Sequence, residues 1–253
     1  MRDYEQELKD RVAFIRKLVK EAGAKGVVFG SSGGKDSALA GILCARACED
    51  VLAVMMPCGS KQNYGRDMED ARVLAAQYGI KTMTVDLTKT RDDLVEALKA
   101  GIAASQAPKT ELAPMAIANM APRLRMNALY SIAQSRGALV AGTGNRSEGY
   151  MGYFTKWGDG AFDFNPIADL TVGEIYEFLG WLGAPSSIIE KAPSAGLFEG
   201  QTDEKEMGVT YAAIDEFLLE GTGRPEDLAV IRRYHERSRH KRQPAASYPG
   251  KEE

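Results

Sequence analysis

Apolar residues in the first third of the chain recur with two periods. Spacings of three and four residues predict an amphipathic helix over 7–20, and similar patterns predict helices at 37–49 and 67–78. Between these helices lie short apolar runs of strand length, at residues 26–30, 51–56 and 82–87. Strands that alternate with helices are typical of parallel βαβ units with right-handed crossovers.

The middle of the chain is predicted to continue this alternation. A helical stretch at about 90–101 is followed by a loop or broken helix at 102–114, where the periodicity is weak. A longer helix then extends to roughly Arg136, with Pro122 either near its middle or at its true start. The apolar run at 138–142 ends in a glycine and predicts a fourth strand.

The last third is predicted to be mainly helical. Thr171-x-x-Glu174 has the form of a capping box that opens a helix over 171–182, and helices fill most of 208–238. The tail after Pro244 is expected to be frayed. No linker rich in Pro, Gly or Ser divides the chain, so we expect a single α/β domain: a Rossmann-like, doubly wound, mainly parallel sheet with helices on both faces.

Composition and charge exclude several classes of protein. The 253 residues carry a net charge of −3, which argues against general nucleic-acid binding. Three cysteines without a CxxC pair predict a reduced, cytoplasmic protein and disfavour a structural zinc site. The first five residues are charged rather than a cleavable apolar segment, and no apolar run is long enough to span a bilayer.

The main chemical signal is the glycine-rich turn after the first strand, Ser32-Gly33-Gly34-Lys35-Asp36-Ser37. In a doubly wound protein, backbone amides at this place bind phosphate at a helix N-terminus. The glycines let the backbone approach a ligand, and the two serines add hydroxyl donors. Asp36 would repel phosphates unless a cation lay between them, so it predicts Mg²⁺.

Two better-known phosphate loops do not fit this sequence. In a Walker loop Gly34-Lys35 would be followed by Ser or Thr rather than Asp36, and Phe29 would be glycine. A dinucleotide fingerprint would require a third glycine where Ser147 follows Gly142-Thr143-Gly144. A plain glycine-rich turn with a capping Asp is the structural alternative.

The pattern Ser-Gly-Gly-x-Asp-Ser instead resembles the pyrophosphate loop of the ATP pyrophosphatases, the adenine nucleotide alpha-hydrolase superfamily, which cleave ATP to AMP and pyrophosphate. Within that superfamily, several blocks over about residues 10–245 look like those of the ammonia-dependent NAD synthetases. These blocks are Gly142-Thr143-Gly144-Asn145-Arg146-Ser147-Glu148, Gly152-Tyr153-Phe154-Thr155-Lys156-Trp157-Gly158-Asp159-Gly160, Asp163-Phe164-Asn165-Pro166-Ile167, Pro193-Ser194-Ala195-Gly196-Leu197, Gln201-Thr202-Asp203-Glu204 and His240-Lys241-Arg242.

The resemblance implies a homodimeric ligase that activates the carboxylate of deamido-NAD. ATP and Mg²⁺ would convert this carboxylate into an acyl adenylate, and ammonia would then displace AMP to give NAD. A glutaminase would need a further domain of roughly 200 residues, so we expect free ammonia or an ammonia-supplying partner. Neither a nucleic acid nor a membrane is an expected partner.

The same resemblance assigns site residues. The metal ligands would be Asp36 and Glu148. ATP would contact the loop and two positions beyond it: Gly30, Ser31, Ser32, Gly33, Gly34, Lys35, Asp36, Ser37, Thr143 and Ser194. Deamido-NAD would contact Arg123, Lys156, Asp163, His240 and Lys241.

Each substrate contact has a plain structural alternative. Arg123 would be a solvated charge, Lys156 and Asp163 would pin a glycine-rich loop by an ion pair, and His240-Lys241 would belong to a solvated helix end. We also expect Asp159 or Asp163 to steer or deprotonate ammonium.

One position departs from the family pattern. Where many members have a lysine that contacts ATP phosphate, this chain has Val172. The transition state at phosphorus still needs cationic stabilisation, so we expect Lys35 or Lys61 to provide the charge. Asp36, Lys35 and Asp163 are thus the expected catalytic residues, and 61–66 and 192–206 are expected to order as lids.

Two rival functions remain open at this point. One is another ATP pyrophosphatase ligase, such as a tRNA-modifying enzyme, although such enzymes usually carry an RNA-binding region that this acidic chain lacks. The other is a regulatory module that binds ATP without turnover. Asp36 and Glu148 argue against a regulatory module, because a sensor has no need for a pair of metal carboxylates.

Overall fold

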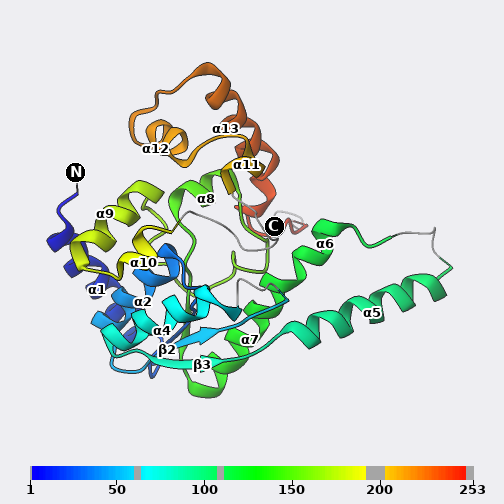
Figure 1. Ribbon diagram of the computed structural model, residues 1–253, viewed down its shortest axis with the longest axis horizontal. Helices are drawn as coiled ribbons and strands as arrows, with labels where there is room; N and C mark the ends of the chain where they lie inside the picture. Colours follow the sequence, from blue (N-terminus) through cyan, green and yellow to red (C-terminus); the bar gives the residue numbers. More distant parts are fainter. Residues whose placement is uncertain (1, 60–63, 107–110, 192–202, 249–253) are drawn as a thin grey trace, which may run out of the picture.

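The computed structural model describes residues 2–59, 64–106, 111–191 and 203–248. Within them, four parallel strands form one sheet in the order β3-β2-β1-β4 (Figure 1). The strands are β1 (Val27–Gly30), β2 (Val51–Met55), β3 (Lys81–Thr84) and β4 (Leu139–Ala141). The chain moves outward from β1 to β3 and then returns to the other side of β1, so the strand order reverses between β1 and β4. This reversal is the place where doubly wound sheets bind ligands.

One face of the sheet is covered by the first helix of the chain, by the helices that follow β1 and β2, and by two helices that come after β4. Side chains of Val27 and Phe29 point to this face, because successive residues of a strand alternate between faces. Their neighbours come from α1 (Tyr4–Glu21), α2 (Lys35–Ala47), α4 (Arg66–Tyr78), α9 (Val172–Leu182) and α10 (Ser186–Ile189). These elements form the largest apolar core.

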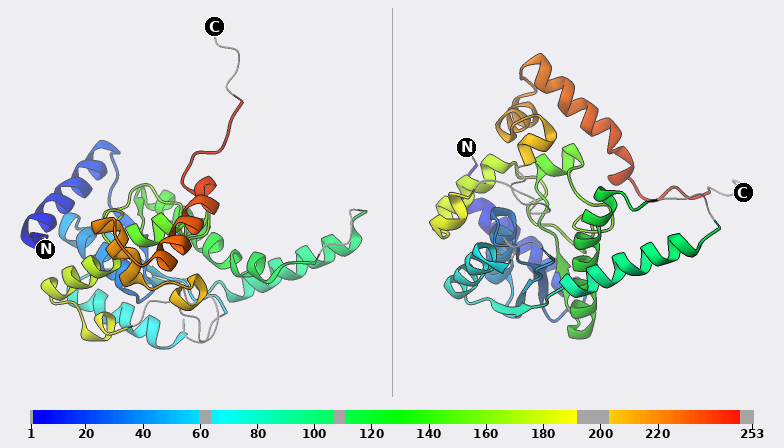
Figure 2. Two further views of the ribbon diagram at one scale, coloured as in Figure 1. Left: turned by 90° about the horizontal axis from the view of Figure 1, so that it is seen from above. Right: turned by 45° about the vertical axis from the view of Figure 1, so that its right-hand side comes forward.

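The opposite face is covered chiefly by α7 (Met120–Arg136), which packs on Val28 of β1 and Val54 of β2. Next to it, α5 (Thr88–Ala104) extends away from the body of the molecule as an arm, and α6 (Pro114–Ala118) lies between the arm and α7 (Figures 1 and 2). None of the described residues of α5 is buried. The arm therefore adds little to the core of the single chain.

The C-terminal third forms a smaller apolar cluster beside the sheet. It joins α8 (Arg146–Met151) and the start of α9 to α11 (Asp203–Met207), α12 (Tyr211–Glu220) and α13 (Pro225–Arg237), and the short 3-10 helix η1 (Arg239–Lys241) follows. Met151, Ile214 and Ile231 are fully buried in this cluster. It fixes α8 and the N-terminus of α9 next to the carboxyl ends of the strands.

The predicted α/β fold is confirmed, including the capping box of Thr171 and Glu174, whose two hydrogen bonds are both present. Pro122 lies at the third position of α7, so it marks the start of that helix. The third strand ends at Thr84 rather than at residue 87, and residues 85–87 connect it to α5, which begins at Thr88. None of the described helices is both long enough and apolar enough to cross a membrane.

Candidate active site

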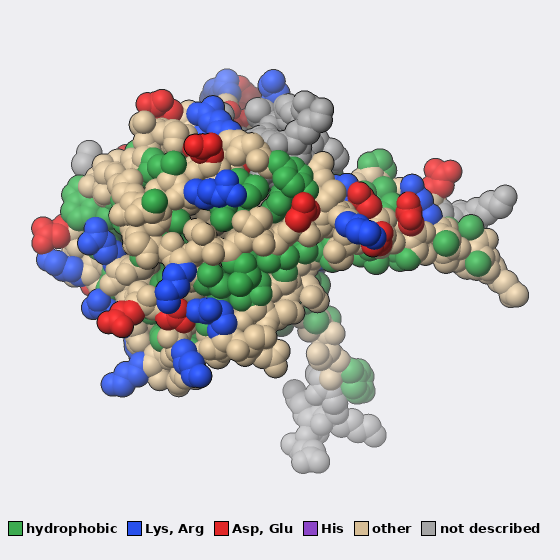
Figure 3. All heavy atoms as spheres, turned by 60° about the horizontal axis from the view of Figure 1, so that its bottom comes forward, with side chains coloured by type: hydrophobic (Ala, Val, Ile, Leu, Met, Phe, Trp, Pro, Cys, Tyr) green, Lys and Arg blue, Asp and Glu red, His purple; other side chains and the backbone are tan. Residues whose placement is uncertain are grey.

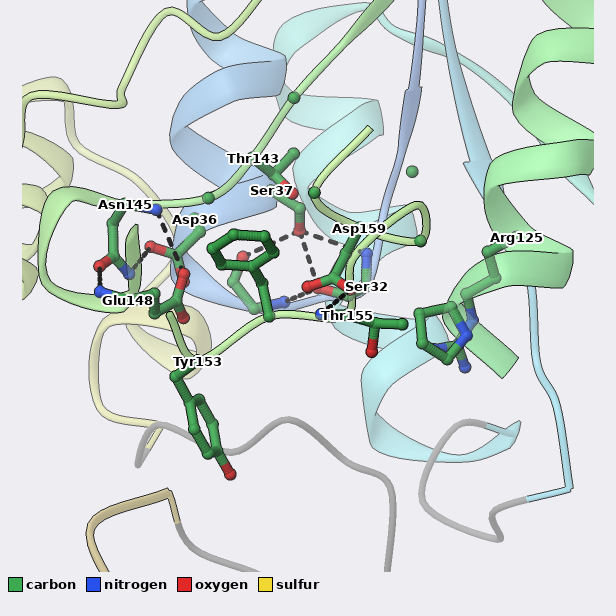
Figure 4. Close-up of a pocket in the computed structure, with 18 of the residues that line it drawn as sticks. Ser32, Asp36, Ser37, Arg125, Thr143, Asn145, Glu148, Tyr153, Thr155 and Asp159 are labelled. Carbon is green, nitrogen blue, oxygen red and sulfur yellow. Dashed lines mark hydrogen bonds between the residues drawn. The ribbon is translucent and has the colours of Figure 1, made fainter. Parts of the chain in front are cut away.

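A cavity of about 880 Å³ lies at the carboxyl ends of β1, β2 and β4. Its walls are the turn after β1, the end of β2, much of the segment 140–162 and the inner face of α7 (Figure 4). Sites for small molecules usually measure roughly 300–1,000 Å³, so the cavity is large enough for a nucleotide. It also lies at the reversal of strand order, where a ligand is expected.

The turn after β1 is held in shape by its own serines. The Ser37 hydroxyl donates to the Gly34 carbonyl at 3.0 Å, and the Ser32 backbone N–H donates to Ser37 Oγ at 3.2 Å. Helix α2 begins at Lys35, two residues earlier than predicted, so Lys35 and Asp36 lie in its first turn. The turn therefore lines the cavity at the N-terminus of α2, a position that favours an anion.

At Gly33, the surrounding backbone leaves no room for a side chain. Its φ is +72°, and an added Cβ would lie 2.1 Å from the carbonyl oxygen of Asp67. We predict that Gly33→Ala lowers the free energy of unfolding by roughly 2–6 kcal/mol, the sum of backbone strain and steric overlap. Denaturant unfolding of the purified protein measures this loss.

Gly34→Ala is the matched control for that prediction. Gly34 has φ −97°, and the nearest atom to its added Cβ is Ser32 Oγ at 3.3 Å. We expect this variant to remain within about 1 kcal/mol of the wild type. Equal losses in the two alanine variants would contradict the role of Gly33.

Two carboxylates from separate elements meet on one side of the cavity. Asp36 lies on α2 and Glu148 on α8, and Figure 4 shows them close together beside Asn145. The side chain of Asn145 connects them: its amide donates to Asp36 Oδ1 at 3.0 Å, and its Oδ1 accepts the Glu148 N–H at 2.9 Å. Burial and the nearby Asp36 charge raise the pKa of Glu148 to about 8.

This pair of carboxylates fits a magnesium site of the kind that ATP completes. Two buried carboxylates side by side repel each other, so a positive charge between them would be favourable. Among the described residues, no three His, Cys, Asp or Glu side chains gather closely enough to hold a metal by themselves. Mg²⁺ commonly takes one or two carboxylates plus phosphate oxygens and water, which matches this arrangement.

Lys35 adds a buried positive charge to the same cluster. Its ammonium donates to Asp36 Oδ2 at 2.8 Å and lies 5.8 Å and 5.7 Å from the ring centres of Tyr176 and Tyr211. Burial alone would lower the pKa of Lys35, but the charges of Asp36 and Glu148 raise it above its ordinary value. The lysine therefore stays positively charged in the cavity.

Val172 is buried in the apolar cluster at the start of α9. It is the first residue of α9, one turn before Tyr176, and it packs in the same apolar cluster as Tyr211. Both rings that contact Lys35 therefore belong to the apolar cluster that contains Val172. Lys61, the other residue expected to provide the charge, lies outside the described residues, as does Ser194.

Three of the five expected substrate contacts gather at the rim of the cavity, and a fourth lines it. Arg123 Nε donates to the Lys156 carbonyl at 3.3 Å, and Lys156 Nζ donates to the His240 carbonyl at 2.8 Å. Lys241 lines the cavity, where its ammonium donates to the carbonyls of Gly152 and Phe154 at 2.8 Å and 2.7 Å. Burial lowers the pKa of Lys241.

The two carboxylates considered for ammonium lie in different places. Asp163 is not part of the cavity wall: its carboxylate accepts the Val140 N–H at 2.7 Å and the Tyr130 hydroxyl at 3.2 Å. Asp159 does line the cavity, and its carboxylate accepts the Thr155 N–H at 2.9 Å. Burial raises the pKa of Asp159.

Sequence reasoning did not single out two polar residues of the cavity, Asn145 and Arg125. Arg125 lies on the side of the cavity opposite the carboxylate pair, and its Nε donates to the Met56 carbonyl at 3.0 Å (Figure 4). Burial lowers the pKa of this guanidinium. The signal for Asn145 was present in the sequence, since Asn followed three residues later by Glu148 is a capping box.

A glycine-rich turn at the switch point of a parallel sheet, with a large cavity beside it, defines an α/β protein with a nucleotide-binding site. Comparison with known proteins identifies the family. The NAD synthase family model matches residues 7–245, so the chain belongs to the NAD synthase family. The expectation drawn from the sequence blocks is thereby confirmed.

Individual relatives agree with this assignment. The chain is 45% identical to an NH(3)-dependent NAD(+) synthetase of Carboxydothermus hydrogenoformans over 241 residues, which cover 95% of this chain and 96% of that protein. An NH3-dependent NAD synthetase structure from Campylobacter jejuni is 29% identical with a TM-score of 0.76, covering 98% and 100% of the two chains. The structure of NMN synthetase from Francisella tularensis is 35% identical with a TM-score of 0.90, covering 98% and 100%.

Proposed function

We propose that this protein is a ligase that amidates deamido-NAD to NAD with ammonia, in a reaction that cleaves ATP to AMP and pyrophosphate. Its family and its relatives named NH(3)-dependent NAD(+) synthetase support this reaction. The observation that carries the proposal is the position of the Asp36 and Glu148 carboxylates. They lie beside the glycine-rich turn at the start of α2, where the phosphates of ATP would bind.

In the first step, a nicotinate carboxylate oxygen attacks the α-phosphorus of ATP, and the bond to the β-phosphate oxygen breaks. The N-terminus of α2 and the Lys35 ammonium would hold the phosphates and stabilise the charge that develops on pyrophosphate. Mg²⁺ held by Asp36 and Glu148 would neutralise part of the same charge. No covalent intermediate on the protein is needed, because binding and orientation bring the two substrates together.

In the second step, ammonia attacks the acyl carbon and AMP leaves with the bridging oxygen. Ammonium must lose a proton before it can attack. Asp159 is the better placed of the two carboxylates considered for this task, because it lines the cavity and Asp163 does not. A carboxylate with a raised pKa is suited to hold ammonium and to accept its proton.

The direct assay of this proposal is incubation of the protein with deamido-NAD, ATP, Mg²⁺ and ammonium. We expect NAD, AMP and pyrophosphate in equal amounts. ADP as the product, or the absence of any product, would contradict the proposal. The same assay separates the ligase from an ATP-binding module without turnover, and from a tRNA-modifying enzyme that would ignore deamido-NAD.

A second candidate substrate is the mononucleotide, deamido-NMN. The observation in its favour is the TM-score of 0.90 with the Francisella NMN synthetase, against 0.76 with the Campylobacter NAD synthetase, at full coverage of both structures. The ratio of kcat/KM for the two substrates decides between them. We expect deamido-NAD to be preferred, as the relatives at 40–47% identity imply.

We further propose that the enzyme is a homodimer in which the α5 arm of one protomer packs on its partner. Leu94 and Leu98 lie one turn apart on α5, and each is 38% exposed. Met83 of the edge strand β3 and Met115 of α6 are also exposed. Figure 3 shows hydrophobic side chains in a band from the body toward the arm. A second copy would bury this surface, which a single chain leaves open.

Charged residues on the arm should therefore separate the protomers. We predict that Leu94→Glu combined with Leu98→Glu gives a protein of half the wild-type mass by light scattering after size exclusion. Glu96→Lys is the matched control, because residue 96 lies on the opposite face of the helix from both leucines. A wild-type mass for the double leucine variant would contradict this interface.

The cysteine chemistry supports a cytoplasmic location. Cys44, Cys48 and Cys58 are free thiols, and Cys44 and Cys58 are buried in apolar cores. Free thiols are usual in a reducing compartment.

A further inference from the structure

The ammonium of Lys35 forms a hydrogen bond with the same carboxylate that is proposed to bind the metal. Lys35 Nζ donates to Asp36 Oδ2 at 2.8 Å, and Asn145 Nδ2 donates to Asp36 Oδ1 at 3.0 Å. Both oxygens of Asp36 therefore already accept a hydrogen bond from a protein donor. One of those donors carries a full positive charge.

The surrounding side chains hold this ammonium in place. Lys35 begins α2 and is only 6% exposed, so its side chain has little freedom to move into water. The rings of Tyr176 from α9 and Tyr211 from α12 lie 5.8 Å and 5.7 Å from the nitrogen, within the range of a cation–π interaction. The carboxylate of Glu148 adds further attraction.

A divalent cation that binds Asp36 would meet this charge at close range. Two cations on one carboxylate repel each other, and the repulsion is strong where little water is present to screen it. The ammonium must then either move away or weaken the binding of the metal. ATP changes this balance, because its phosphates offer Lys35 another anionic partner at the adjoining turn.

We propose that Lys35 is an internal competitor for the metal, which withholds Asp36 from Mg²⁺ until the phosphates of ATP draw its ammonium away. Metal and nucleotide then bind together, and each strengthens the other by the same factor. The inference rests on the proposed Mg²⁺ site at Asp36 and Glu148. It adds a mechanism by which this chain would take up the metal only with its nucleotide.

The test measures Mn²⁺ binding by electron paramagnetic resonance in the full-length protein without nucleotide. Lys35→Met removes the charge and keeps an unbranched apolar side chain between the two tyrosines. We expect this variant to bind Mn²⁺ at least about tenfold more tightly than the wild type, a typical size for coupling between two sites. α,β-Methylene-ATP should strengthen Mn²⁺ binding in the wild type far more than in Lys35→Met.

Three further variants make the result specific. Lys81→Met removes one charge at the opposite end of the sheet, where Lys81 pairs with Asp50, and it should leave Mn²⁺ affinity unchanged. Lys35→Gln repeats the charge removal with a polar side chain, should Lys35→Met fold poorly by circular dichroism. Asp36→Asn should abolish the binding that the other variants modulate.

An Mn²⁺ affinity in Lys35→Met and Lys35→Gln that equals or falls below that of the wild type overturns the proposal. It would mean that ammonium and metal share Asp36 without competing. Mn²⁺ binding that Asp36→Asn leaves intact overturns both the metal site and the competition. The formation of NAD from deamido-NAD is assayed separately, so failure of the competition is distinguishable from failure of the proposed reaction.

Discussion

Lys35→Ala slows the formation of the acyl adenylate by about 10²–10³-fold, the effect expected when one group that stabilises transition-state charge is removed. The reason is that Lys35 is the cation next to Asp36, while Val172 leaves the start of α9 without one. The measurement is a single-turnover experiment, in which the enzyme is in excess and the release of pyrophosphate is followed before ammonia is added.

Moving the charge provides the control for this prediction. Val172 and Tyr211 belong to one apolar cluster, and Lys35 contacts the ring of Tyr211, so a lysine at position 172 would bring an ammonium toward the same region. We expect Lys35→Ala combined with Val172→Lys to recover at least about tenfold of the lost rate. Near-normal turnover in both Lys35→Ala and Lys61→Ala would contradict the assignment of this charge.

Glu148→Gln lowers kcat by about 10²–10³-fold and raises the Mg²⁺ concentration needed for half-maximal rate. This substitution removes the negative charge while keeping the shape of the side chain. It also keeps the helix start, because Gln can accept the Asn145 N–H as Glu148 does in the capping box. Loss of activity would then reflect the missing charge rather than a frayed α8. Steady-state rates across a Mg²⁺ titration measure both effects.

The chain offers a closely matched control. Glu174 occupies the same third position in the capping box of α9, and it lies outside the wall of the cavity. Glu174→Gln should leave both kcat and the Mg²⁺ requirement close to the wild-type values. A Glu148→Gln enzyme with an unchanged Mg²⁺ requirement would show that Glu148 is not a metal ligand.

Most of the fold could be predicted because its elements have strong local signals. Most strands and helices through residue 182 follow from hydrophobic period, although α8 was not predicted, and the capping box of Thr171 and Glu174 marks a helix start directly. The order of the strands in the sheet could not be read in this way. It depends on how β4 returns to pair with β1, a contact between residues more than a hundred positions apart.

In the site, too, some features follow from the local sequence and others depend on how the elements pack. The turn at 32–37 was recognisable because glycines and hydroxyl residues follow a buried strand, but Lys35 could only be placed on Asp36 once α2 and α9 were packed. Arg123 and Arg125 are two residues apart on one helix, so they point in different directions. Which of them enters the cavity depends on the rotation of α7, and Arg125 is the one that does.

Asp163 shows what a motif leaves open about position. The resemblance assigned it to the substrate, and in this chain its carboxylate holds the backbone of β4 and the hydroxyl of Tyr130. Its role toward deamido-NAD remains a proposal. Asp159, four residues earlier, lies in the cavity wall because residues 155–160 form a tight turn there.

The central claim is that the carboxylate of deamido-NAD becomes an adenylate before ammonia attacks. Deamido-NAD with ¹⁸O in both oxygens of its nicotinate carboxylate tests this claim directly when it is converted with ATP, Mg²⁺ and ammonium. The bridging oxygen comes from the substrate and leaves with AMP, so mass spectrometry should find one ¹⁸O in each AMP formed and none in pyrophosphate. NAD formation with unlabelled AMP would contradict the adenylate, whatever else the site binds.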